Sequence, residues 1–237
     1  MKGLSFVTLS LLIVLAASVS LADSFGIMME GFDDGSFERW TDAAICYDDN
    51  FSFEVIWSDF DGSYVLKHEG GTEWGGGNRE AYLPGLSARE AYIEADIRNV
   101  EAWHKTAKAM GLALRINETT GEQYLCWLTV SGDLFLYKTR SWTACGPGFL
   151  TKTKIDSIGE GDLFHLSFGV VGNTLSVSVN GMLQFTYTDV NPLPAGSAGV
   201  VATAGITYFD NISVVDNNRA MFEVAATWGR IKTNFSE

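Results

Sequence analysis

The segment 164-FHLSFGVVGNTLSVSVNGMLQFTYT-188 decides the fold class of this chain. Apolar and polar side chains alternate over 164–170, 175–179 and 183–187, which predicts three β-strands with one buried and one exposed face. Gly172-Asn173 and Asn180-Gly181 separate these strands, and residues of both types tolerate the positive φ that tight hairpins need. The segment therefore predicts a β-meander.

Outward from this segment, the same pattern of short apolar runs and turns continues in both directions. Two further strands are expected at 199–201 and 206–214, after a loop rich in Pro and Gly. Upstream, strand-like runs are found at 27–41, 51–57, 64–67, 92–100, 110–116, 124–130 and 134–140. No internal repeat and no alternation of strands with helices is present, so the sequence predicts an all-β sandwich or barrel.

The composition supports one large core and an acidic surface. The chain has 237 residues, 46% of them hydrophobic, and a formal net charge of −13. A negative surface argues against nucleic acid and anionic membranes as partners, since both attract positive charge. Such a surface suits solubility alone, neutral ligands such as sugars, or divalent cations.

The first 22 residues have the features of a signal peptide. Lys2 provides the charged start, 4–19 the apolar centre, and small residues precede an expected cleavage after Ala22. An uncleaved anchor is the alternative. We expect a jelly-roll domain over 23–215, a tail over 216–237, no later membrane span, and a secreted or extracytoplasmic location. Export would allow a disulfide among Cys46, Cys126 and Cys145, but their spacing does not select a pair.

Several short motifs together resemble a known superfamily. They are Phe32-Asp-Asp-Gly, Gly111-Leu-Ala-Leu-Arg-Ile, Leu134-Phe-Leu-Tyr-Lys, Leu175-Ser-Val-Ser-Val-Asn-Gly and Tyr208-Phe-Asp-Asn-Ile-Ser-Val. Over 27–215 the chain resembles the concanavalin A-like lectins and glucanases, which include laminin-G-like domains and family 16 glucanases. The resemblance implies a two-sheet antiparallel jelly roll, carbohydrate bound on a concave face or at rim loops, and a structural calcium ion.

Two acids on apolar strand faces suggest a calcium site. Period-two alternation places Glu30 with Met28 and Phe32, and Asp210 with neighbouring core residues of the last strand. Two inward carboxylates would repel each other, and a bound Ca²⁺ would remove that cost. The resemblance implies that an N-terminal acid, a late-strand Asp and backbone carbonyls hold the ion, and Gly70 or Gly71 is expected to supply one of the carbonyl oxygens. The alternative is that Glu30 faces water and Asp210 makes a hydrogen bond.

A family 16 glucanase carries closely spaced acids on one strand. Here Glu94 and Asp96 share a strand face, but the next acid is Glu101, which is too distant to complete the pattern. The resemblance therefore does not extend to the catalytic motif, and we assign no catalytic residue.

Sugar C–H faces stack on exposed aromatic rings flanked by planar polar groups. Candidates of this kind occur in three loops and on strands of the expected concave face. The predicted sugar-binding residues are Trp74, Asn78, Arg79, Trp103, Arg115, Tyr124, Tyr137, Arg140 and Trp142, whereas Trp40, Trp57 and Trp127 are expected in the core.

These patterns predict a secreted, non-catalytic, lectin-like domain that binds a polysaccharide or glycan. A divergent family 16 hydrolase and a structural or adhesive surface domain are the alternatives. The tail carries Met221, Val224, Trp228 and Ile231 at helical spacing. It is expected either to pack as a terminal helix or to dock on a surface or another protein.

Overall fold

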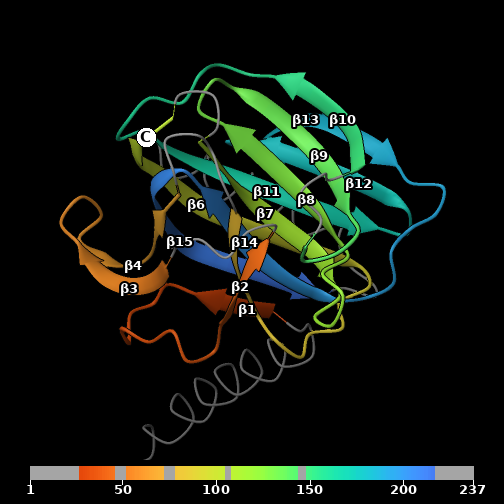
Figure 1. The fold of residues 1–237 in the computed structure, drawn as a ribbon, viewed down its shortest axis with the longest axis horizontal. Helices are drawn as coiled ribbons and strands as arrows, with labels where there is room; N and C mark the ends of the chain where they lie inside the picture. Colours follow the sequence, from red (N-terminus) through yellow and green to blue (C-terminus); the bar gives the residue numbers. More distant parts are fainter. Residues whose placement is uncertain (1–26, 46–51, 72–77, 105–107, 144–147, 217–237) are drawn as a thin grey trace, which may run out of the picture.

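The computed structural model describes residues 27–45, 52–71, 78–104, 108–143 and 148–216, and it is an all-β protein (Figure 1). Two antiparallel sheets lie face to face, as predicted for a concanavalin A-like jelly roll. The expected signal peptide, the tail, Trp74, Cys46 and Cys145 lie outside the described residues. Within these ranges, no helix is long and apolar enough to cross a membrane.

The larger sheet has eight strands in the order β13-β12-β11-β6-β15-β4-β3, with β1 also paired to β15. Its strands are β1 (Ile27–Glu30), β3 (Ser52–Ser58), β4 (Ser63–Gly70), β6 (Ala91–Ala102), β11 (Leu163–Val171), β12 (Thr174–Val179), β13 (Met182–Thr188) and β15 (Gly205–Asp216).

The second sheet has seven strands in the order β10-β9-β8-β7-β14-β5-β2. Its strands are β2 (Thr41–Ile45), β5 (Asn78–Tyr82), β7 (Ala109–Ile116), β8 (Gln123–Thr129), β9 (Asp133–Thr139), β10 (Gly148–Lys154) and β14 (Ser197–Thr203).

The segment that predicted the fold forms β11, β12 and β13, three neighbouring strands at one edge of the eight-stranded sheet (Figure 1). The turn between β12 and β13 is Asn180-Gly181, with φ of 51° and 75°, as the sequence indicated. The two following strands separate: β14 enters the seven-stranded sheet, whereas β15 lies between β6 and β4. The final strand therefore joins the middle of the larger sheet rather than extending the meander.

The core lies between the sheets and consists of alternate residues from both. Phe168, Ile93 and Phe209 of the larger sheet and Leu112 and Tyr124 of the smaller one are almost fully buried. Burying each such side chain stabilises the fold by roughly 1.5–3 kcal/mol.

Two of the three tryptophans expected in the core lie elsewhere. Trp40 is 6% exposed and packs against Phe32, as predicted. Trp57 is 55% exposed, which contradicts the prediction, because it stands near the end of β3, an edge strand, beside the turn that follows. Trp127 lies on the outward face of the seven-stranded sheet, opposite to the core side chains of β8.

A buried arginine connects three loops to the end of β7. Arg115 has φ of 54° and is 3% exposed. Its guanidinium donates hydrogen bonds to the carbonyl oxygens of Arg89 (2.6 and 3.1 Å), Leu193 (2.8 Å) and Gly172 (2.8 Å). The guanidinium thus supplies hydrogen-bond donors to carbonyl groups that have no partner within their own loops. It holds the three loops in place together.

Replacing Arg115 with Met should lower the free energy of unfolding by roughly 2–4 kcal/mol, because the hydrogen-bonded carbonyls lose their donors while the side-chain stem is retained. Urea denaturation of the wild type and the variant measures the change. Arg39→Met is the matched control, since Arg39 is exposed, and it should change stability by less than about 0.5 kcal/mol. Equal losses in both variants would contradict the proposed role of Arg115.

Candidate functional site

The outward face of the seven-stranded sheet carries a group of four aromatic rings. Trp127 of β8, Phe135 and Tyr137 of β9 and Phe149 of β10 form this group, here called the aromatic cluster. Ring centroids are 5.5 Å apart for the stacked pair Phe135–Tyr137 and 6.2 Å apart for Trp127–Tyr137 and for Tyr137–Phe149. Phe149 is 55% exposed, so part of the cluster is open to solvent.

A second ring pair lies on the same face. Tyr82 of β5 stacks on Trp142, with centroids 5.8 Å apart and planes at 25°. The Trp142 indole donates to the carbonyl oxygen of Glu118, and its backbone packs close to Gly121, where a Cβ atom would lie 2.3 Å from the Trp142 nitrogen. Trp142 is therefore fixed in position on the outward face, with one ring face covered by Tyr82.

Two small residues leave the middle of this face without large side chains. Gly199 of β14 and Ala113 of β7 are paired neighbours, and a Cβ atom at Gly199 would lie 2.6 Å from the carbonyl oxygen of Ala81. Ala113 and Gly199 thus separate Tyr82 from Leu125 and Tyr137 along one row of the sheet. Larger side chains at both ends of this row rise above its centre.

A buried carboxyl group lies on this face too. Glu80 of β5 is fully buried and accepts a hydrogen bond of 2.8 Å from the Gln123 side chain of β8. Burial raises the pKa of Glu80 to about 8, whereas the Gln123 hydrogen bond acts to lower it. One oxygen of each side chain has no hydrogen-bond partner in the described structure. Glu80 is therefore largely protonated at neutral pH.

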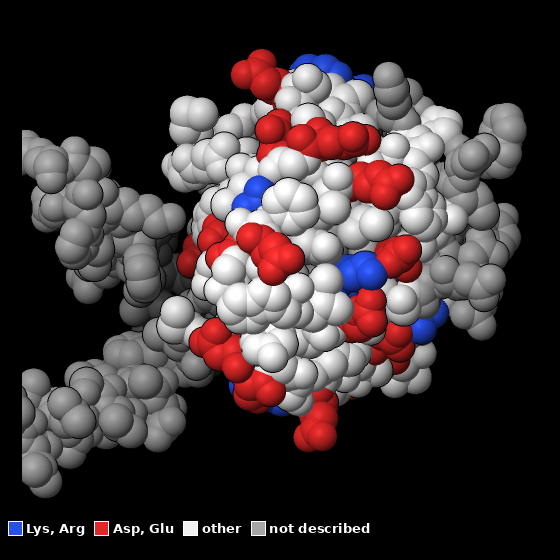
Figure 2. All heavy atoms as spheres, turned by 90° about the vertical axis from the view of Figure 1, so that its left-hand side faces the viewer, with Lys and Arg blue, Asp and Glu red and all other residues white. Residues whose placement is uncertain are grey.

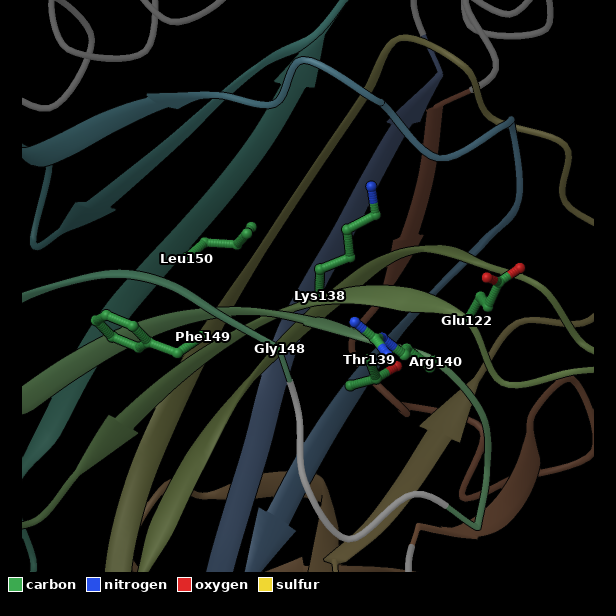
Figure 3. Close-up of a pocket in the computed structure, with 7 residues that line it drawn as sticks. All are labelled: Glu122, Lys138, Thr139, Arg140, Gly148, Phe149 and Leu150. Carbon is green, nitrogen blue, oxygen red and sulfur yellow. The ribbon is translucent and has the colours of Figure 1, made fainter.

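The cluster borders a shallow hollow of about 440 Å³ at the ends of β8, β9 and β10 (Figure 3). Figure 3 shows Phe149 and Glu122 at opposite ends of the lining residues, with Arg140 between them. Arg140 follows β9 and is exposed. The lining of the hollow therefore includes a cation and an exposed aromatic ring, with Gly148 between them in Figure 3.

Only some of the predicted sugar-binding residues come together on this face. Tyr137, Arg140 and Trp142 lie on it or at its edge. Tyr124 faces the core instead: it is 0% exposed, donates a 2.6 Å hydrogen bond to Asp189, and accepts one from the Leu193 amide. The Arg115 guanidinium is hydrogen-bonded to the carbonyls of three loops. Neither Tyr124 nor Arg115 is therefore available to a ligand on this face.

The remaining predicted residues are distributed around the sheet. Arg79 of β5 forms an ion pair with Asp42, at 2.6 Å between Nη2 and Oδ2, on the same sheet face as the core residue Ala81. Asn78 begins the same strand and is half-buried. Trp103 follows β6 in the other sheet, and its amide donates to the Ala204 carbonyl. Trp74 lies outside the described residues.

Asp210 is directed differently from the prediction. It pairs with Asp96 on β6 and accepts a 3.2 Å hydrogen bond from Ser63, whereas Ile212 is buried in the core. A bulge at Asn211, with φ of 49°, shifts the register and inverts the alternation between Asp210 and Ile212. Asp210 is therefore on the outward face, and burial raises the pKa of its carboxyl group.

The other two predicted calcium ligands do not join Asp210 in one site. Glu30 pairs with Ile212, and its carboxylate binds the Phe32 amide (3.1 Å) and Arg39 (3.4 Å). Gly70 pairs with Gly205, which lies seven residues before Ile212, the partner of Glu30. Gly70 and Glu30 are therefore separated by roughly 20 Å along β15. Within the described ranges no group of three or more His, Cys, Asp or Glu side chains is arranged so that it could hold a metal ion. The residues present do not fit the predicted three-ligand set.

Glu94 and Asp96 share the outward face of β6, in the eight-stranded sheet, as their spacing indicated. His165 of β11 lies between them, with Nδ1 2.7 Å from Asp96 and Nε2 3.3 Å from Glu94. Hydrogen bonds that the His165 ring donates to Asp96 and Glu94 raise its pKa to about 9, so the imidazole is charged at neutral pH. His165 thus holds both acids and offsets one of their two negative charges, on the sheet that does not carry the aromatic cluster.

Solved structures confirm the fold. The chain is similar to the carbohydrate-binding module CBM66 from Bacillus subtilis, with a TM-score of 0.58, 12% identity, and coverage of 75% of this chain and 95% of that one. The cellulose-induced protein Cip1 matches with a TM-score of 0.56 and 15% identity, over 80% of this chain and 97% of that one. These identities are too low to carry function across.

A glucanase has the same fold. The family 16 enzyme from the Bacteroides ovatus mixed-linkage glucan system, solved with a G4G4G3G product, matches with a TM-score of 0.58 and 12% identity, over 79% of this chain and 99% of that one. No protein-family model and no curated protein sequence matches this chain. The comparisons therefore establish a concanavalin A-like jelly roll shared by binding modules and enzymes.

Replacing Glu80 with Gln should change the pH dependence of stability. An acid whose pKa rises on folding, here from 4.5 to about 8, holds its proton more tightly in the folded state. The contribution of Glu80 to the free energy of unfolding should therefore fall by up to a few kcal/mol between about pH 4.5 and pH 8 and then level off. Glu80→Gln removes this decline and should be more stable than the wild type at pH 8.5.

Urea denaturation at pH 5, 7 and 8.5 measures this difference. Glu38→Gln is the matched control, because Glu38 is exposed. It should leave the pH profile of the wild type unchanged. A constant stability difference between wild type and Glu80→Gln at all three pH values would mean that Glu80 is ionised in the folded protein.

Proposed function

We propose that this protein binds a polysaccharide or glycan on the outward face of its seven-stranded sheet. The observation that carries the proposal is the aromatic cluster, because four rings from β8, β9 and β10 gather outside the core. Aromatic rings that the core does not require are the usual platform for the C–H faces of sugars. Phe149 provides the most exposed ring and Tyr137 the centre, in contact with the other three.

Polar groups suited to sugar hydroxyls border the rings. Arg140 and Glu122 line the same hollow as Phe149, whereas Thr139 in this lining is buried and donates its hydroxyl to the Gly121 carbonyl. Planar guanidinium and carboxylate groups form paired hydrogen bonds with adjacent hydroxyls, which fix the orientation of a ring stacked nearby. The arrangement supports binding along β8–β10 rather than in a deep enclosed pocket.

We propose binding without turnover, with a divergent glycoside hydrolase as the alternative. Hydrolysis of a glycosidic bond needs two carboxyl groups that reach the sugar. On the described strands of this face, Glu80 is fully buried, and Asp133 is paired with Lys154 at 3.2 Å. A reducing-sugar assay on soluble β-glucans separates the two functions, since release of reducing ends would favour the hydrolase.

Secretion completes the proposal. It rests on residues 1–22, whose pattern predicts export. Docking through the tail over 216–237 stays a prediction from its helical spacing. A protein that bound none of the glycans tested would instead support a structural or adhesive role.

Replacing Trp127 or Tyr137 with Ala should weaken glycan binding by roughly tenfold or more, because each change removes a ring at the centre of the cluster. A glycan array followed by isothermal titration with the best ligand measures the loss. Trp57→Ala is the matched control: Trp57 is 55% exposed on β3 in the other sheet, and its loss should leave affinity unchanged. Equal affinity of Tyr137→Ala and wild type would place the site elsewhere.

Calcium binding stays a prediction from the sequence and the resemblance. If an ion binds only to the folded protein, it stabilises the fold by about 2.7 kcal/mol at a concentration 100-fold above its dissociation constant. The melting temperature should then fall by several degrees when EDTA replaces calcium. Melting curves that superimpose in EDTA and in calcium chloride would contradict the prediction.

A further inference from the structure

The stretch that supplies most of the aromatic cluster is unusually basic for this chain. Residues 134–154 contain Lys138, Arg140, Lys152 and Lys154 and no Asp or Glu. The whole protein has 16 Lys and Arg against 29 Asp and Glu. A quarter of the positive charges thus lies in one acid-free stretch, which forms most of β9, the connection that follows it, and β10.

Charge is therefore unevenly distributed over the molecule. Figure 2 shows the side of β3 and β4, which lies to the left in Figure 1, and Asp and Glu outnumber Lys and Arg there. At physiological ionic strength charges are screened over about 8 Å. A ligand on β9 and β10 therefore experiences mainly the local cations rather than the net negative charge of the protein.

Two of the four cations already have carboxylate partners. Lys138 binds Asp189 at 2.7 Å, and Lys154 binds Asp133 at 3.2 Å. Arg140 and Lys152 are exposed, and neither forms an ion pair with a described residue, although the charge of Lys152 acts on the nearby Asp133, which is paired with Lys154. Within the described ranges, neither cation therefore has a close ion pair to break when an anion binds.

Both cations lie beside the aromatic cluster. The Lys152 ammonium is 5.4 Å from the centre of the Phe135 ring, which holds it over the cluster. Arg140 lines the hollow together with Phe149 (Figure 3). Along β9, the positions of Phe135 and Arg140 are five residues apart, or roughly 17 Å. The two cations are therefore more than one sugar unit apart, with Lys152 over the cluster and Arg140 just beyond the end of β9.

We propose that the ligand is an anionic polysaccharide, whose carboxylate or sulfate groups bind Arg140 and Lys152 while its sugar rings stack on the aromatic cluster. The inference rests on the proposed function and narrows it, because neutral glycans would make no use of the two cations. Exposed charges without a close ion pair attract an anion at low cost, since no existing ion pair has to break.

Titration calorimetry of the full chain with polygalacturonate, dextran sulfate and neutral mixed-linkage β-glucan tests the inference. Polygalacturonate supplies carboxylates, and dextran sulfate supplies sulfates. At least one of these two should bind more tightly than the neutral glucan, and its binding should weaken as sodium chloride rises from 50 to 500 mM. Arg140→Gln combined with Lys152→Gln should reduce that affinity by roughly tenfold.

The double variant Arg39→Gln with Lys67→Gln is the charge-matched control, because it removes two exposed or partly exposed cations from the β1–β4 part of the molecule. It should keep the affinity of the wild type, and melting curves should show that both double variants are folded. Equal losses in the two double variants would overturn the inference. Binding of neutral glucan alone would overturn it and leave the proposed function intact, whereas binding of no glycan, on a glycan array as well, would overturn both.

Discussion

The seven-stranded sheet is packed with apolar side chains on both faces, and the candidate site depends on this constraint. Tyr124, Leu112 and Leu136 close the core on one side, so the fold does not require the rings on the other side. A sheet that buried apolar residues on one face only would present polar residues here, as antiparallel sheets commonly do. The aromatic cluster is thus additional to the core, and a ligand that covers it is the simplest reason for its presence.

Polarity changes across this face from its centre to its edge. Near the centre, Glu80 is buried and its raised pKa keeps it largely neutral at pH 7, so it adds little negative charge to the surface. At the edge, Arg140 and Lys152 are exposed and charged. The face therefore combines an apolar middle with a positive rim, even though the chain as a whole is strongly acidic. A glycan with anionic groups complements both parts at once.

The sequence predicted the fold from features that are local. Asn180-Gly181 specifies a tight hairpin, and the alternation on each side of it specifies one buried face. It did not predict which face of β8 is inside, because Tyr124 and Trp127 stand on opposite faces and both faces are largely apolar. It also did not indicate that Glu80 is buried, because the hydrogen bond between Gln123 and Glu80 forms only in the tertiary structure. Positions with positive φ caused the other errors: Arg115 and Asn211 interrupt the alternation from which the directions of Arg115 and Asp210 were inferred.

Because a glucanase and a binding module share this fold, the fold alone does not decide between an enzyme and a binding protein. Enzymes and binding modules on this scaffold differ in the side chains they present, so the decision depends on particular residues. In this chain the closely spaced acids Glu94 and Asp96 belong to the eight-stranded sheet, and both accept hydrogen bonds from His165. The rings belong to the other sheet. Hydrolysis of a glycosidic bond needs two carboxyl groups that reach the sugar. Glu94 and Asp96 lie on the sheet without the rings, and Glu122 is the one acid among the described residues that line the hollow with Phe149, which agrees with the proposed binding without turnover.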